Sequence, residues 1–452
     1  MRAASGSQAK TAKKVRQGEQ SVSHATNKAA PETVSTLLEH AIKARATAIH
    51  IEPQSTGGAL VRYRIDGVLS NADNVTRDIV AGLLQRFKTL SGLRGEETQL
   101  PQDGHFKMRV GKSYTFTLHV ATMPVNFGEK LVVTLQQDSA TLPSPKDLGL
   151  WGDSLSAFTD ITEETRGLIV VGGLYDAGTS TTAYVILQSH NVTTHSLASI
   201  EDSISHPIAG ASQTLVNRHI GLTHASGLRA LLKQDTNTIM VDDIREPDTA
   251  HITATAALGG HLLIGVVRAP SAVASIVRLQ AMGIEPFVLA STLRVATGQY
   301  LVRKLCDKCK QQYTPSQNIV TGICNSFGLK GRDQFHQLIG YVATAARDGI
   351  GVYDAKHPPV TSKTLVRLWQ PSAKGCNACN HTGFKGRIGL FEILTPSAEL
   401  QKLITGRAPQ TMLHNQAVAD GMVPVKVDGL VKSLLGLTTV DEVIRAVGST
   451  NL

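Results

Sequence analysis

The stretch GLIVVGGLYDAGTSTTAYVILQSHN, which begins at Gly167, constrains the fold of this chain more than any other feature. Its first residues form an apolar run typical of a strand buried inside a parallel sheet. A glycine-framed loop and then a helical pattern follow directly. Strand, glycine loop and helix in this order are the context of a phosphate-binding loop, in which backbone N–H groups surround phosphate oxygens. We therefore expect an α/β domain.

The loop itself keeps only part of the phosphate-binding pattern G-x-x-x-x-G-K-[ST]. Gly173, Gly178 and the hydroxyl residue Ser180 stand at the required spacing, but Thr179 replaces the lysine. That lysine normally reaches the β- and γ-phosphates. Thr181 supplies a second hydroxyl of the type that holds Mg²⁺. These five residues are the predicted nucleotide-binding residues of a degenerate loop.

Two further apolar strands are expected, NTIMVDD from Asn237 and GHLLIGVV from Gly260. The first of them ends in two carboxylates, Asp242 and Asp243. Carboxylates at the end of a parallel strand lie at the same edge of the sheet as the phosphate loop, where ligands bind. The order of these segments makes a chance glycine-rich turn the weaker interpretation of the loop.

Composition sets the outer limits. The chain has 452 residues, 42% hydrophobic and 18% charged, which is typical of a globular protein of two to three domains. No apolar run of about 18 residues occurs, so no membrane-spanning helix is expected. The net charge is +9, but the first 30 residues hold six basic side chains against one acid. We expect a disordered basic tail there and no nucleic-acid binding by the folded body.

The cysteines form two C-x-x-C pairs, Cys306 with Cys309 and Cys376 with Cys379. Two such turns can supply four thiolates to one tetrahedral Zn²⁺, a structural site without catalytic function. The remaining Cys324 lies between the pairs, and we expect it to be a free buried thiol. Two unrelated thiol pairs are the alternative.

Longer segments resemble one known family. The texts AIHIEP, VRYRIDGVL, LPQDG, AMGIEPFVLASTLR, GQYLVRKLCDKCK, GCNACNHTGFKGRIGLFEIL and DGLVKSLLGLTTVDEVIRAV appear in the order of the type IV pilus assembly and type II secretion ATPases. The resemblance covers residues 32 to 450. It implies a RecA-like P-loop NTPase domain, a small α+β domain before it, and a zinc-bearing C-terminal region.

The resemblance also implies domain boundaries and surroundings. Partners would be the other subunits of a homo-hexamer or of a mixed hexamer with an active homologue, and an inner-membrane platform protein. The location would be cytoplasmic, at the inner face of the cell membrane. The expected divisions are a basic tail at 1–30, an α+β domain at 31–138, a linker at 139–165, the RecA-like domain at 166–300, a tetracysteine zinc element with an insertion at 301–390, and a helical region at 391–452.

Departures from the family text lie at the residues that would contact phosphates. The family loop reads GPTGSGKST, so Asp176 replaces a glycine as well as Thr179 the lysine. A carboxylate 4 Å from a phosphate charge is repelled by about 4 kcal/mol at an effective dielectric near 20. The resemblance places the catalytic acids at Asp243, shorter than the family's glutamate, and at Glu201 of the text IEDSIS, where Ser205 replaces an acid.

Further motifs have changed too. Arg268 stands at the histidine of the family text STLHTNDA. Several arginines that the family supplies from its first domain are replaced here. The residues in the corresponding segments are Thr98, Gln99, His105, His119 and Thr134. Arg62 and Arg64 remain. Such arginines contribute large rate factors in phosphoryl transfer.

Three hypotheses follow. The first is a pseudo-ATPase subunit, a scaffold or regulator of a hexameric ring, with structural Zn²⁺ and weak or no binding of ATP and Mg²⁺. The second is an active ATPase that drives pilin assembly or secretion with another cation, such as Arg268 or Lys233, in place of the lysine. The third is a basic-tailed adaptor for nucleic acid or membrane on an inactive fold.

Overall fold

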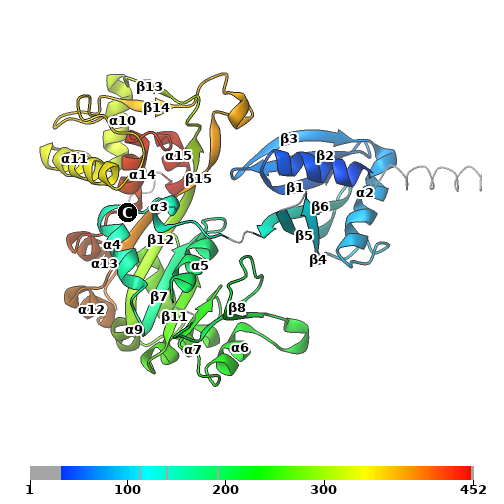
Figure 1. The fold of residues 1–452 in the computed structure, drawn as a ribbon, viewed down its shortest axis with the longest axis horizontal. Helices are drawn as coiled ribbons and strands as arrows, with labels where there is room; N and C mark the ends of the chain where they lie inside the picture. The colour runs from blue at the N-terminus through cyan, green and yellow to red at the C-terminus, as the bar shows by residue number, and fades with distance from the viewer. Residues whose placement is uncertain (1–31, 111–113, 139–140, 191–192, 449–452) are drawn as a thin grey trace, which may run out of the picture. The chain divides into compact units, whose positions relative to one another are not determined.

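The computed structural model describes residues 32–110, 114–138, 141–190 and 193–448. The basic tail expected at 1–30 lies outside these residues. The chain divides into two compact units, Met1–Ser139 (unit 1) and Ala140–Leu452 (unit 2). Their helices and strands are labelled in Figure 1.

Unit 1 is an antiparallel sheet in the order β3-β2-β1-β6-β5-β4, with a helix at 32–43 and α2 packed against it. Leu37 of the first helix and Phe87 of α2 are buried in the core of this unit. Asp66 and Gly67 both have positive φ, as the tight turn of an Asp-Gly hairpin requires. The small α+β domain expected before the phosphate loop is confirmed. Its elements are β1 (Ala46–Pro53), β2 (Ala59–Ile65), β3 (Val68–Val75), α2 (Arg77–Leu90), β4 (Gln102–Val110), β5 (Tyr114–Val125) and β6 (Gly128–Asp138).

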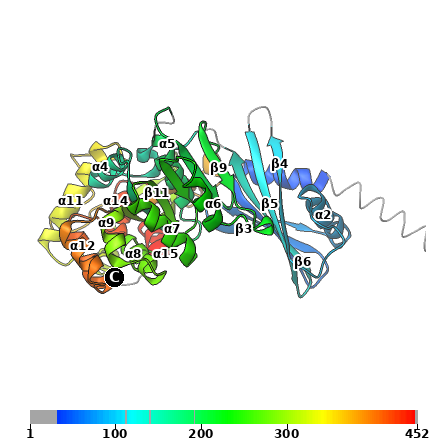
Figure 2. The ribbon, with the colours of Figure 1, turned by 90° about the horizontal axis from the view of Figure 1, so that it is seen from below.

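Unit 2 is built on a sheet in the order β15-β12-β7-β11-β10-β8-β9, in which only β15 is antiparallel to its neighbour. Parallel neighbours require crossover connections, most of which here contain helices that cover the sheet (Figure 2), whereas β8 and β9 are joined by the loop 202–210. The strands are β7 (Gly167–Gly173), β8 (Leu197–Glu201), β9 (Ala211–Leu215), β10 (Thr238–Val241), β11 (Leu262–Val267), β12 (Leu293–Leu305) and β15 (Phe384–Leu394).

The apolar run of β7 divides between two cores. Leu168 and Val170 pack with α6–α9, α12 and α13, whereas Ile169 and Val171 pack with α4 and α5. Because successive strand residues point to opposite faces, a strand covered on both sides is apolar throughout. The α/β, RecA-like architecture is confirmed. The helices are α5 (Thr179–Ser189), α6 (His224–Leu231), α7 (Pro247–Leu258), α8 (Ala272–Ala281), α9 (Pro286–Thr292), α12 (Ala398–Thr405), α13 (Gln410–Ala419) and the 3₁₀ turn η1 (Arg218–Ile220).

The segment expected as a linker at 139–165 carries two helices, α3 (Pro145–Leu148) and α4 (Gly152–Ile161). Ser144 and Asp147 cap α3 reciprocally. Phe158 of α4 is fully buried against the sheet. This segment therefore belongs to unit 2, because its apolar residues have a core to enter. The boundary expected at 390 also falls inside β15.

The insertion between the cysteine pairs, which ends before the 3₁₀ turn η2 (Asn377–Cys379) of the second pair, has its own elements: β13 (Gln311–Tyr313), α10 (Gln317–Phe327), α11 (Arg332–Arg347) and β14 (Leu368–Gln370). It shares one core with α14 (Val425–Leu434) and α15 (Val440–Val447). Cys324, expected to be buried, is half-buried at the margin of this core. The insertion and the C-terminal helices thus fold together.

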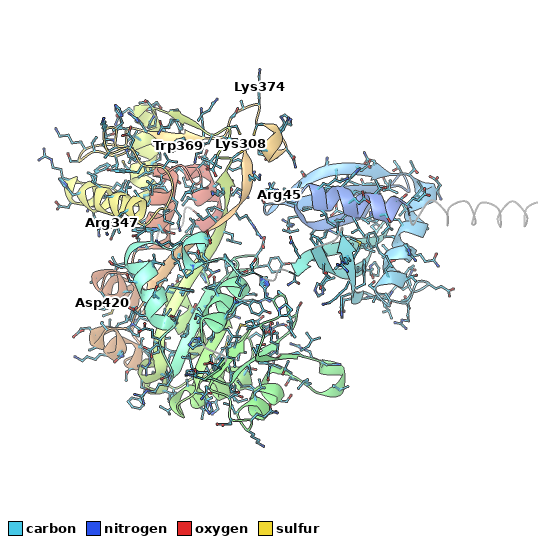
Figure 3. All side chains as sticks on the ribbon, in the orientation of Figure 1. Arg45, Lys308, Arg347, Trp369, Lys374 and Asp420 are labelled. Carbon is cyan, nitrogen blue, oxygen red and sulfur yellow. The ribbon has the colours of Figure 1, made fainter. Side chains whose placement is uncertain are left out.

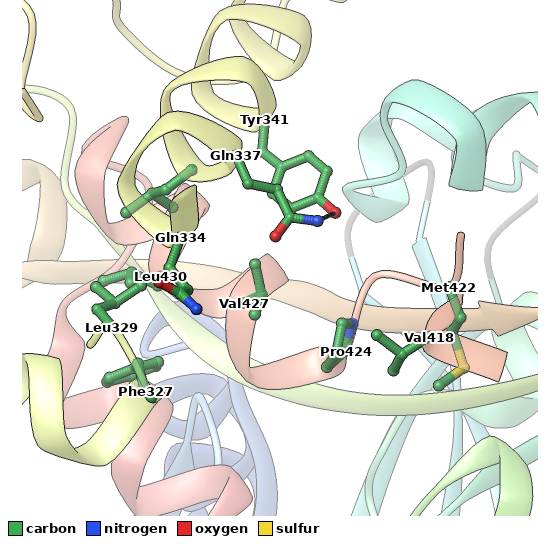
Figure 4. Close-up of a pocket in the computed structure, with 12 residues that line it drawn as sticks. Phe327, Leu329, Gln334, Gln337, Tyr341, Val418, Met422, Pro424, Val427 and Leu430 are labelled. Carbon is green, nitrogen blue, oxygen red and sulfur yellow. Dashed lines mark hydrogen bonds between the residues drawn. The ribbon is translucent and has the colours of Figure 1, made fainter. Parts of the chain in front are cut away.

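A cavity of about 160 Å³ lies between α11 and the segment 418–430 that includes α14. Figure 4 shows Gln337 and Tyr341 of α11 on one side of it and Val427 of α14 on the other. Gln337 donates a 2.7 Å hydrogen bond to the hydroxyl of Tyr341. Within the described part of the chain, no helix is both long and apolar enough to cross a bilayer.

Candidate functional site

The degenerate phosphate loop, 174–178, leaves the carboxyl end of β7 and leads into α5. Gly178 has φ +83°, and a Cβ on Gly173 would lie 2.6 Å from Thr179 Cγ2, so both positions need glycine. Gln299 of β12 donates a 2.8 Å hydrogen bond to the carbonyl of Ala177. The glycine frame of the loop therefore has the geometric basis that its spacing indicates.

The amino end of α5 begins at Thr179, and its N-cap, Gly178, offers no side-chain cap. The first N–H groups of the helix are left for other partners, and such a terminus favours anions. Ser180 is exposed, and Thr179 and Thr181 are half-buried. The five predicted nucleotide-binding residues thus lie together around one helix terminus, without the lysine charge.

Asp176 lies in this loop with φ +60° and carries its own counter-ion. Its Oδ2 lies 2.7 Å from Nη1 of Arg387, on β15. From the sequence, Asp176 is expected to add an anion where a triphosphate would lie. The structure instead pairs it with an arginine, so the loop carries a local charge pair.

Asp243, the predicted catalytic acid after β10, is 5% exposed. Its Oδ2 forms ion pairs with two arginines, Arg245 Nη2 at 2.8 Å and Arg268 Nη2 at 3.0 Å, and accepts a 3.1 Å hydrogen bond from Arg268 Nε. Its Oδ1 is buried and has no hydrogen-bond partner among the described residues. Arg268, the first candidate to replace the lysine, is therefore the counter-ion of this acid.

Glu201, the second predicted catalytic residue, ends β8 and is fully enclosed. The hydroxyls of Tyr184 and Ser199 donate to its two oxygens, and Gln213 Nε2 lies 3.2 Å from one of them. Burial raises the pKa of Glu201 above its usual value, although these hydrogen bonds oppose the shift. Ser205 joins the network through its backbone N–H, which donates to Tyr184 at 3.0 Å.

A further polar group was missed by sequence reasoning. His224, the first residue of α6, is 4% exposed, and its Nε2 lies 2.6 Å from Asp242 Oδ1 and 4.0 Å from Asp202 Oδ1. Burial lowers the pKa of His224, but the hydrogen bond and charge of Asp242 outweigh it, so the pKa lies above its usual value. The sequence signal for this group was Asp242, the first acid of DDIRE, where the family text GEIRD has glycine.

These side chains form a connected charge group at the carboxyl edge of the sheet. Arg245 bridges Asp202 and Asp243, so three acids meet three bases. Lys233, the other candidate substitute cation, lies between α6 and the amino end of β10 and so belongs to the opposite edge. The group's members are Asp202, His224, Asp242, Asp243, Arg245 and Arg268.

In unit 1, three positions at which the resemblance implies arginines prove to be neighbours. His105 pairs in register with His119, and His119 with Thr134. The row continues through Ala48 to Arg64. Residues directly opposite on neighbouring strands share one face of the sheet. A row of this kind is invisible in sequence because its members come from five strands.

Arg62 and Arg64, the two arginines of unit 1 that are kept from the family text, have partners inside that unit. Arg62 Nη2 lies 2.6 Å from Glu52 Oε2, and Lys130 Nζ lies 2.8 Å from Oε1 of the same carboxylate. Arg64 donates a 3.0 Å hydrogen bond to the carbonyl of Gly67.

The four paired cysteines come together, as their spacing indicates. Sγ separations are 3.7 Å for Cys306 with Cys376 and 3.8 Å for both Cys309 and Cys376 with Cys379. Four thiolates around one Zn²⁺ at about 2.3 Å stand about 3.8 Å apart, so the cluster fits a tetrahedral ion. The loops that hold it also carry Lys308 and Lys374, labelled in Figure 3.

Comparison with known proteins agrees with this architecture. The family described as "Type II/IV secretion system protein" matches residues 24–445. The type II secretion system ATPase E of Vibrio cholerae is 33% identical over 412 residues, covering 91% of this chain and 74% of that protein. The type IV pilus assembly ATPase TfpB of Acinetobacter baylyi is 32% identical over 417 residues, covering 92% of this chain and 65% of that protein.

Two solved structures share the fold. The ATPase DotB of Legionella pneumophila has a TM-score of 0.60 at 16% identity, covering 92% of this chain and 95% of that chain. The pilus retraction motor PilT, solved with ADP, has a TM-score of 0.54 at 18% identity, covering 92% of this chain and 96% of that chain. At such low identity the likeness concerns the fold alone.

Proposed function

Because this chain belongs to the type II/IV secretion system protein family, we propose that it is a motor-type subunit with little or no ATPase activity. It would act as a scaffold or regulator in a hexameric ring, alone or with an active homologue. Its place would be the cytoplasmic face of the inner membrane, beside a platform protein of a pilus or secretion machine.

The observation that carries this proposal is the state of Asp243. The acid at this position must position a water beside the γ-phosphate, but one oxygen of Asp243 is already ion-paired with Arg245 and Arg268. The replacement of the family's lysine by Thr179 also removes one positive charge, and Arg387 is already paired with Asp176. Phosphoryl transfer depends on such positioned cations.

We propose two cofactor assignments with it. Zn²⁺ occupies the tetracysteine cluster and stabilises the region that carries the insertion. ATP with Mg²⁺ binds weakly or not at all at the amino end of α5. The tetrahedral spacing of the thiols supports the first assignment, and the composition of the loop supports the second.

The test compares three proteins, the wild-type chain, the double variant Asp176→Gly with Thr179→Lys, and a homologue with an intact GKS loop. Mg-ATP binding is followed by calorimetry and turnover by phosphate release. We expect weak binding and no measurable turnover for the wild type. The double variant should gain binding without turnover, since Asp243 keeps both arginine partners. Robust hydrolysis by the purified wild-type chain would overturn the proposal.

Assembly is tested separately by light scattering on the chain alone and mixed with the active homologue. Hexamers in either sample support the ring. A monomer in both samples contradicts it, whatever the outcome of the ATPase assay.

A second candidate function is an active ATPase with non-standard phosphate contacts. Two observations favour it, the uncapped amino end of α5 beside Ser180 and the unpartnered Oδ1 of Asp243. If the wild type hydrolyses ATP, Ser180→Ala and Asp243→Asn should each abolish turnover. A contaminating ATPase would be unaffected by either change.

A further inference from the structure

We propose that Asp202, His224 and Asp242 form a second metal site, for a divalent transition ion such as Zn²⁺, separate from the tetracysteine cluster. Each of the three offers one ligand atom, and these atoms lie within 4.8 Å of one another. The site does not depend on the proposed function, because its evidence lies in the ligand geometry.

The donor types match such an ion. One imidazole nitrogen and two carboxylate oxygens are ligands that Zn²⁺ and its neighbours accept, with bonds of about 2.0–2.2 Å. Ligand atoms in a tetrahedral site of that size are about 3.4 Å apart. The distances from His224 Nε2 to Asp242 Oδ1, 2.6 Å, and to Asp202 Oδ1, 4.0 Å, bracket this value. Small rotations of the two carboxylates would equalise them.

Each carboxylate also has a hydrogen-bond partner on its Oδ2. Asp242 Oδ2 accepts a 2.7 Å hydrogen bond from the backbone N–H of Asp202, and Asp202 Oδ2 accepts from Arg245. In each case the other oxygen, Oδ1, is the one nearest His224. Outer partners that orient ligands in this way are a regular feature of metal sites.

The exposed fraction of the side chain differs among the three ligands. The side chain of His224 is 5% exposed and that of Asp242 15%, whereas that of Asp202 is 41% exposed. The ion would therefore enter from the side of Asp202 and keep a position open to water or another ligand. It would tie the ends of β8 and β10 to the start of α6.

The experiment counts bound metal on full-length protein. Protein equilibrated with Zn²⁺ and then desalted is analysed by elemental analysis, and a Co²⁺-loaded sample by absorption. We expect one ion more than the tetracysteine cluster holds. His224→Gln and Asp202→Asn should each remove only that ion, and Arg245→Gln should weaken its binding about 10- to 100-fold. The control is His251→Gln, an exposed histidine on α7.

The two sites can be separated. Cys376→Ser should abolish the sulfur-to-cobalt charge-transfer bands and leave the weaker bands of nitrogen and oxygen ligation. Asp202 is largely exposed, so Asp202→Asn keeps the test valid if His224→Gln fails to fold. The proposal is overturned if the wild type retains only the ion of the cysteines and Asp202→Asn changes nothing. The group would then be a hydrogen-bonded charge cluster only.

Discussion

Arg387 of β15 and Asp176 of the degenerate phosphate loop form an ion pair, 2.7 Å between Nη1 and Oδ2, across 211 positions of sequence. The loop's added acid is thus balanced by the edge strand that is antiparallel to the rest of the sheet. The pair is partly exposed, so its contribution to stability should be below about 1 kcal/mol. Its larger effect is on the charge that the phosphate loop presents to the triphosphate of ATP.

We predict that Asp176→Asn strengthens Mg-ATP binding by about tenfold, which corresponds to about 1.4 kcal/mol. The substitution removes a negative charge and releases Arg387 toward the amino end of α5. Arg387→Gln should have the opposite effect. Calorimetric titration measures both, with Asp248→Asn, an exposed acid on α7, as the control. Equal affinities in all four proteins would show that this pair does not govern the loop.

Removing one cluster thiol should release the metal. We expect about one Zn²⁺ per chain at the four cysteines, and its loss in Cys376→Ser together with a clearly lower melting temperature, because structural zinc contributes folding energy directly. Cys324→Ser is the matched control, since this thiol lies outside the cluster. Elemental analysis and thermal unfolding provide the readouts. Metal-free wild-type protein, purified without chelator, would contradict the assignment.

The buried pair Asp428 and Lys432 should be the most sensitive polar contact of α14. Their side chains are 4% and 0% exposed, and Oδ2 lies 2.6 Å from Nζ. Trp151 Nε1 donates to the other carboxylate oxygen at 2.6 Å. Asp428→Ala leaves the buried ammonium of Lys432 with the carbonyl of Gly389 but without its carboxylate, which should cost about 3–5 kcal/mol.

Urea unfolding tests this, with Asp420→Ala as the control, an exposed acid labelled in Figure 3. The control should change the free energy of unfolding by less than about 1 kcal/mol. A similar small change in Asp428→Ala would refute the assigned role.

Glu442 should make stability depend on pH in the acid range. Burial raises the pKa of Glu442, but hydrogen bonds from Arg303 and Arg445 lower it by more. The pKa therefore lies below the ordinary 4.5. An acid whose folded pKa is depressed stabilises the protein above its unfolded pKa, and this contribution disappears as pH falls through the folded pKa. Glu442→Gln should therefore be most destabilising near neutral pH.

Denaturant unfolding of wild type and Glu442→Gln at a series of pH values checks this, with Glu399→Gln, exposed on α12, as the control. The difference between wild type and Glu442→Gln should shrink below pH 4.5, the ordinary value of this carboxyl. A difference that is constant with pH would indicate lost packing instead of a lost charge.

Local sequence patterns predicted what depends on local spacing. The strand, glycine loop and helix around Gly173 are short-range features, and the cysteine turns carry their ligands at fixed offsets. Family text located Asp243 and Glu201. The chemical state of these residues was beyond such patterns, because Arg268 and Tyr184 reach them only after the sheet has formed.

The segment at 139–165 shows the opposite limit. Its prolines favoured a linker, yet Phe158 of α4 is buried in the core between this helix and the sheet. Burial in the tertiary structure therefore outweighed the local sequence signal. His224 and Asp242 carried no spacing motif, since parallel strand order alone brings their segments together. Arg387 was equally hidden, because an antiparallel edge strand cannot be ordered from one sequence.

The two halves of the cysteine cluster are 70 positions apart, and β15 follows the second half directly. At about 5–20 residues per second, a ribosome needs roughly 4 to 14 s to deliver the second half after the first. During that interval the first cysteine pair lacks the two thiols of the second pair. Only afterwards does the chain release the strand that bears Arg387. The ion pair between Arg387 and Asp176 can therefore form only after both cysteine pairs have been synthesised.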